Sequence, residues 1–104
     1  MIGALFRRVL NAEKVTIGTA PNRLIDDLTL TAFNTGTTRL TIQNIDSADN
    51  AEWSYSTTGA TSGQMGILVP YQSIVFNWEV RYLNDIWIAG ADAGKLLYIM
   101  EEGI

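Results

Sequence analysis

The sequence contains no cysteine and no histidine. The absence of cysteine excludes a disulfide framework, a thiolate nucleophile and a thiolate metal site. The absence of histidine removes the commonest general base of enzymes and the commonest side-chain ligand of transition metals. The sequence also contains neither of the nucleophile motifs G-x-S-x-G and S-x-x-K. We therefore expect no enzyme activity, no cofactor and no bound metal.

Charged residues are scarce as well. They make up 17% of the 104 residues, below the roughly 25% of an average soluble protein. Either a partner covers part of the surface, or a large core leaves Ser, Thr and Asn to supply surface polarity. The net charge is −4 and the seven Lys and Arg are scattered, which argues against nucleic acid or an anionic membrane as a partner. No apolar run approaches the roughly 20 residues that span a bilayer.

Two polar segments suggest binding sites but fail on spacing. Residues 90–95 lack the four residues between glycines, and the Ser or Thr after the lysine, that a phosphate-binding P-loop requires. We interpret them as a hairpin loop. A second segment offers oxygen atoms to Ca²⁺ from Asp46, Asp49, Asn50 and Glu52. Because its spacing matches no dedicated calcium loop, we interpret it as a solvated acidic turn.

The chain divides into a leading segment, residues 1–12, and a domain, residues 13–104. In the leading segment, apolar residues fall at helical spacing at Ile2, Leu5, Phe6, Val9 and Leu10. This favours a short amphipathic helix or an arm that docks on a neighbour. A first β-strand or a frayed terminus is the alternative.

From Lys14 onward, apolar residues alternate with polar ones, as in Val15 and Ile17 or Leu40 and Ile42. Period two is typical of strands with one buried face. Turn-forming residues such as those at 34–36 separate the runs about every ten residues. The sequence therefore predicts an all-β fold: a single antiparallel β-sandwich, jelly-roll-like or a small barrel, with about eight short strands and a short N-terminal arm or helix.

The last predicted strand, residues 95–101, is apolar on both faces. Leu97 and Ile99 share one face, and Leu96, Tyr98 and Met100 share the other. Such a strand is either central in its own fold or covered by another chain. Trp87 is expected to extend that surface, because aromatic residues are favoured interface anchors. The candidate interface residues are Ile2, Leu5, Phe6, Val9, Trp87, Leu96, Tyr98 and Met100.

The order of segments from residue 38 onward resembles small β-sandwich virion proteins of tailed phages, which decorate or stabilise capsids or associate with tails. The resemblance is carried by TRLTIQN (residues 38–44), a polar loop with Gly63 and Gly66, LVPYQSIVF (68–76) and DIWIAGADAGKLLYIMEEG (85–103). It implies a homo-oligomer, with a trimer favoured, that binds other virion subunits such as the major capsid or tail protein. It also implies location in the virion, on the capsid or tail surface, after a soluble stage in the host cytoplasm.

Two other functions stay open. The three Trp and four Tyr could stack against sugars, which would make the chain a carbohydrate- or surface-binding module. Because most of them alternate in phase with aliphatic residues, a place in the core is the simpler interpretation. A cellular or toxin-like β-domain with an unrelated partner is the third possibility.

Overall fold

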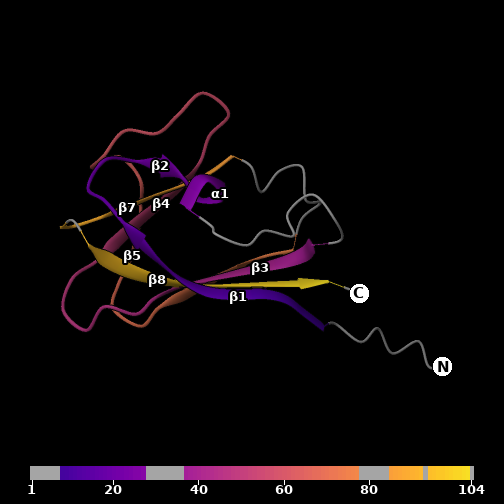
Figure 1. Cartoon of the computed structure of the whole chain (residues 1–104). Coiled ribbons are helices and arrows are strands. Elements are labelled where there is room, and N and C mark those ends of the chain that lie inside the picture. The colour runs from indigo at the N-terminus through magenta and orange to yellow at the C-terminus, as the bar shows by residue number, and fades with distance from the viewer. Residues whose placement is uncertain (1–7, 28–36, 78–84, 93, 104) are drawn as a thin grey trace.

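The computed structural model describes residues 8–27, 37–77, 85–92 and 94–103, and strands dominate it (Figure 1). One short helix is present in this part of the chain. The predicted all-β sandwich with about eight strands is confirmed. In chain order the elements are β1 (Arg8–Ile17), β2 (Asn22–Arg23), α1 (Leu24–Asp27), β3 (Thr37–Asn44), β4 (Ala51–Tyr55), β5 (Gly66–Leu68), β6 (Ser73–Phe76), β7 (Ile86–Gly90) and β8 (Lys95–Gly103).

The strands form two four-stranded sheets. Sheet A has the order β1-β8-β3-β6, and sheet B has the order β2-β7-β4-β5. Every pairing between described strands is antiparallel. β8 is therefore an inner strand, hydrogen-bonded to β1 on one side and to β3 on the other. No helix in the described ranges is long and apolar enough to cross a membrane.

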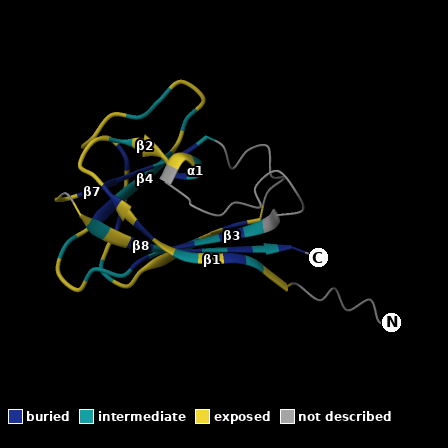
Figure 2. Cartoon of the chain, viewed as in Figure 1, coloured by how far each residue is buried: buried dark blue, intermediate teal, exposed yellow. Residues whose placement is uncertain are grey.

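The apolar core lies between the two sheets, as the alternation predicts. Along β8, Leu97 and Ile99 are fully buried and Tyr98 between them is half-buried. Figure 2 shows how burial varies along the strands. Trp53 on β4 and Phe76 on β6 join the sheets through an edge-to-face ring contact with centroids 5.4 Å apart. The buried cluster consists of Val15, Ile17, Leu24, Leu40, Ile42, Ala51, Leu68, Phe76, Ile86, Ile88, Leu97 and Ile99.

The segment expected to be a hairpin loop is instead a connection between the sheets. β7 pairs in sheet B and β8 pairs in sheet A, so the strands on either side of it do not pair with each other. The connection is fixed to the end of β1, because the Gly90 amide donates to the Gly18 carbonyl and the Gly94 amide to the Ile17 carbonyl. Gly94 has a φ of 82°, which glycine adopts without strain.

The expected boundary at residue 12 does not fall between elements. β1 already begins at Arg8, so residues 8–12 are strand and not helix. Asn11 points inward on the same face as Val15, and it is buried because its amide bonds the carboxylates of Glu13 and Glu101, both at 2.8 Å. Because the buried residue at this position is the polar Asn11, the sequence shows no alternation of apolar and polar residues at the start of the strand. Ile2, Leu5, Phe6 and the turn at 34–36 lie outside the described residues.

Candidate interaction surface

The outward side chains of β8 form an apolar stripe along the middle of sheet A. Leu96 is 39% exposed, and Tyr98 and Met100 are half-buried. We call these three residues the β8 stripe. β8 pairs with β1 along its whole length and with β3 along most of it, so its backbone is held on both sides. The stripe is therefore an apolar surface on a rigid strand.

The neighbours of the stripe on the outer face of sheet A carry few charges. Met100 lies opposite Ala12 on β1 and Thr41 on β3, and Tyr98 lies opposite Lys14 and Gln43. An ion pair closes one end of the face, where Arg39 Nε and Glu102 Oε1 are 3.3 Å apart. Apart from Lys14 beside Tyr98, these neighbours of the stripe are uncharged, and few charges around an apolar centre are typical of a protein interface.

The other predicted interface residues do not all join this surface. Val9 is 56% exposed at the start of β1 and lies opposite Glu102, so it belongs to sheet A near the ion-paired end. Trp87 does not extend the stripe, because β7 is part of sheet B. The sequence could not show this, since it does not say which sheet each strand enters.

Trp87 instead anchors the long β4–β5 loop. Its indole Nε1 donates to the Ser56 carbonyl at 2.9 Å, and the Arg23 guanidinium lies 5.6 Å from the ring centroid. Glu52 on β4 holds the other end of the loop by accepting a hydrogen bond from the Gly63 amide at 3.0 Å. Trp87 is thus a half-buried side chain with partners within the chain.

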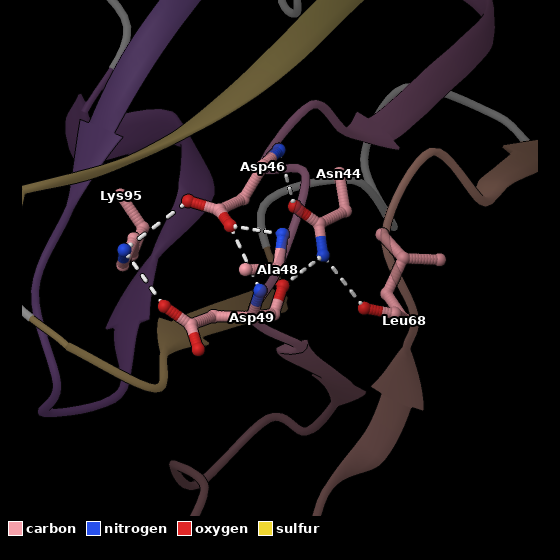
Figure 3. Close-up of polar contacts among 6 residues, drawn as sticks. All are labelled: Asn44, Asp46, Ala48, Asp49, Leu68 and Lys95. Atoms are coloured by element: carbon pink, nitrogen blue, oxygen red, sulfur yellow. Dashed lines mark hydrogen bonds and ion pairs between the residues drawn. The ribbon is translucent and has the colours of Figure 1, made fainter.

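The acidic turn between β3 and β4 is closed by a lysine (Figure 3). Asp46 Oδ1 accepts hydrogen bonds from the Ala48 and Asp49 amides, both at 2.8 Å. Lys95 Nζ, at the start of β8, lies 3.2 Å from Asp46 Oδ2 and 2.7 Å from Asp49 Oδ2. The turn is therefore a clamp between the first residue of β8 and the β3–β4 connection, and Ser47, Ala48 and Asn50 of the turn are exposed, as expected of a solvated turn.

The electrostatics of this clamp favour its charged form. The backbone amides of Asp49 and Ala48, and then the Lys95 ammonium, hold the pKa of Asp46 below its usual range. Hydrogen bonds to Asp49 and Asp46 raise the pKa of Lys95. Two of the carboxylates that suggested calcium, Asp46 and Asp49, thus share an ion pair with Lys95. In the described part of the chain, no group of three or more His, Cys, Asp or Glu could hold a metal ion.

Asn44 connects the clamp to sheet B. It is 1% exposed, and its Nδ2 donates to the carbonyls of Asp49 and Leu68, both at 2.9 Å (Figure 3). Its Oδ1 accepts from the Asp46 amide at 3.0 Å. Sequence reasoning placed Asp46 and Asp49 together but did not identify Lys95, whose partners are distant in the sequence, or Asn44, whose bond to Leu68 spans 24 residues.

Comparisons with known proteins identify no relative of this chain. A scan against protein-family models found no match, and searches of curated proteins and of solved structures gave no significant match. A functional assignment therefore depends on the surfaces of the molecule and on its sequence.

Proposed function

We propose that this chain is a non-enzymatic structural subunit that packs into a larger protein assembly through the outer face of sheet A. The observation that carries the proposal is the β8 stripe. Its three residues, Leu96, Tyr98 and Met100, form an apolar row on the outer face of an inner strand. Outward positions of a sheet are ordinarily polar.

The stripe suits binding because its conformation is already fixed. Strand pairing on both sides of β8 restricts its backbone, so little conformational entropy is lost when a partner covers it. Tyr98 and Met100 belong to residue types enriched at protein interfaces. A standard interface buries about 800 Å² per partner, so the stripe would be the centre of a contact that also includes its polar neighbours.

The assembly we propose is the virion of a tailed phage, in which the chain stabilises the capsid or tail. The support is the sequence resemblance of residues 38–103 to small β-sandwich virion subunits, together with the low share of charged residues. In such a role the subunit adds buried apolar surface across joints between larger proteins, and each additional Å² contributes about 25 cal/mol before association costs.

The proposal is tested by incorporation into particles. The chain and its Leu96→Glu variant are each expressed during phage production, and purified particles are analysed by quantitative mass spectrometry. Tyr55→Glu is the matched control, because Tyr55 is 36% exposed on β4, which is an inner strand of sheet B. We expect the wild type and the control at a fixed copy number per particle, and Leu96→Glu reduced at least tenfold.

Two results would overturn it. Absence of the wild-type chain from purified particles would exclude the virion role. Equal incorporation of Leu96→Glu and Tyr55→Glu would show that the β8 stripe is not the binding surface.

A further inference from the structure

Lys14 places an uncompensated positive charge beside the β8 stripe. It lies on β1 directly opposite Tyr98, and its side chain is exposed on the outer face of sheet A. Within the described residues this side chain makes no ion pair and no hydrogen bond. The adjacent Glu13 lies opposite Ile99 on the inner face, where it accepts a hydrogen bond from Asn11. The charge of Lys14 is therefore available to a partner.

Tyr98 brings a second hydrogen-bond donor to the same place. Residues that lie directly opposite in an antiparallel pair point to the same face, with Cβ atoms about 4.5–5.5 Å apart. Tyr98 is half-buried, and its hydroxyl makes no hydrogen bond in the part of the chain that the structure describes. A carboxylate has two acceptor oxygens, so one carboxylate can accept from both Lys14 and Tyr98.

The outer face of sheet A does not itself supply that carboxylate. Among its described residues the only acidic one is Glu102, which is ion-paired with Arg39 at 3.3 Å. Because this pair is neutral, Lys14 leaves the face with a net positive charge, although the whole chain carries −4. The same face of a second copy would bring positive charge to positive charge, and its carboxylate is already paired. The complement of this face is therefore a different surface.

We propose that the partner of the β8 stripe is a different protein, whose contact surface places an Asp or Glu carboxylate, within an apolar patch, against Lys14 and Tyr98. The patch covers Leu96 and Met100. The carboxylate accepts one hydrogen bond from the Lys14 ammonium and one from the Tyr98 hydroxyl, and such charge-assisted bonds are roughly twice as strong as neutral ones. This inference rests on the proposed function and adds to it the chemistry of the partner.

The carboxylate determines where the partner sits along β8. Hydrophobic contact is non-directional, so an apolar row alone lets a partner bind in several positions. A charge pair selects one of them, because charge complementarity at an interface fixes register and suppresses wrong partners. The stripe thus supplies most of the buried apolar area, while Lys14 and Tyr98 supply specificity.

The test uses phage particles that are produced without this chain. Purified chain is added to them, and the bound fraction is measured by sedimenting the particles, which gives a dissociation constant. Lys14→Met keeps an unbranched side chain but removes the charge, and Tyr98→Phe keeps the ring but removes the hydroxyl. We expect Lys14→Met to weaken binding at least about tenfold and Tyr98→Phe about threefold to tenfold.

Two controls are matched to these variants. Arg8→Met removes the same charge from an exposed position of the same strand, opposite Gly103 and beyond the end of the stripe. Tyr55→Phe removes a hydroxyl on sheet B. Both should bind like the wild type. Raising NaCl from about 50 to 500 mM should weaken the wild type severalfold and Lys14→Met much less, because salt screens a charge pair.

The two proposals fail in different ways. If Leu96→Glu loses binding while Lys14→Met and Tyr98→Phe bind like the wild type, the stripe is the contact but the partner presents no carboxylate, and only this inference is overturned. Wild-type affinity of Leu96→Glu, or no binding by the wild type, would overturn both.

Sedimentation equilibrium of the chain alone tests the remaining occupant. Self-association that Lys14→Met disrupts would identify a second copy as the partner, and would overturn the assignment to a different protein. Melting temperatures show that the variants are folded. Lys14 is exposed, so Lys14→Met decides the case if Tyr98→Phe is destabilised.

Discussion

Asn44 is the residue through which the turn, β3 and sheet B are held together. Its side chain donates to the buried Leu68 carbonyl and the partly buried Asp49 carbonyl, and it accepts from the Asp46 amide. A buried carbonyl without a hydrogen bond costs about 1–3 kcal/mol. The contribution of Asn44 to stability therefore comes mainly from the groups that it satisfies.

We expect Asn44→Ala to lower the free energy of unfolding by about 2–3 kcal/mol, measured by urea denaturation. The neighbouring Gln43→Ala is the control, because the Gln43 amide donates to a single exposed carbonyl, that of Tyr71, at 3.0 Å. That control should lose less than about 1 kcal/mol. Equal losses for the two variants would contradict the role assigned to Asn44.

Tyr71 adopts an unusual backbone conformation. Pro70 and Tyr71 are the central residues of a turn closed by the Gln72 amide and the Val69 carbonyl at 3.0 Å, and Tyr71 has a φ of 63°. A type II turn places its third residue at positive φ, where Gly or Asn is preferred. The Tyr71 side chain is 61% exposed, so little packing offsets the strain.

Tyr71→Asn should therefore stabilise the protein by about 0.5–1 kcal/mol, seen as a higher melting temperature. The backbone amide of residue 71 donates a hydrogen bond of 2.7 Å to the Asn44 carbonyl, and the substitution keeps this backbone contact. Val69→Asn, in the same turn but without positive φ, should bring no gain. A melting temperature lowered by Tyr71→Asn would show that the exposed ring contributes more than the backbone strain costs.

At the scale of elements, the clamp of Asp46, Asp49 and Lys95 links the β3–β4 connection to the first residue of β8. The lowered pKa of Asp46 means that its charged form is favoured by folding. Its contribution is present above the pKa of an unfolded aspartate and is lost as the pH falls through the lower, folded value. The raised pKa of Lys95 matters at high pH, because the stability that the charged lysine contributes is lost only in strong alkali.

We expect the melting temperature to fall more steeply below about pH 4 for the wild type than for Asp46→Asn. The asparagine keeps an acceptor for the two backbone amides but has no charge to lose. Asp92→Asn, an exposed residue in the β7–β8 connection, serves as the control and should retain the wild-type slope. If Asp46→Asn also retains that slope, the clamp does not govern acid stability.

The elements differ in how well the sequence predicts them. Strands β3 and β6 follow from their alternating apolar residues, because one face of each lies on the core, whereas β8 was expected as a strand that is apolar on both faces. The start of β1 was expected only as an alternative to a helix or docked arm, since Asn11 breaks the apolar pattern, and α1 was missed because a four-residue helix has no periodicity to detect. The clamp was missed because ion pairs between distant segments leave no local pattern.

At the scale of the whole molecule, the sequence does not show which sheet each strand joins, and the structure does. Turn-forming residues predicted a connection at residues 90–94 but not that it joins sheet B to sheet A. For the same reason Trp87 was assigned to the surface of β8, although it lies on the other sheet. Fold class depends on local alternation, which the sequence contains. The composition of a surface depends on strand order, which it does not.

One core shared by both sheets predicts a single cooperative unfolding transition. Ile88 in sheet B and Ile99 in sheet A are both almost completely buried in the same cluster. Ile88→Ala and Ile99→Ala should each cost about 2–5 kcal/mol. Such losses would lower the melting temperature of the whole protein by at least about 8 °C.

Leu96→Ala, on the outer face of the same strand as Ile99, should change the melting temperature far less, because Leu96 is not part of the core. Differential scanning calorimetry distinguishes the alternatives. Two resolved transitions, of which Ile88→Ala shifts one and Ile99→Ala the other, would mean that the sheets unfold independently. A single transition that both substitutions shift by similar amounts is what a sandwich stabilised across its interior requires.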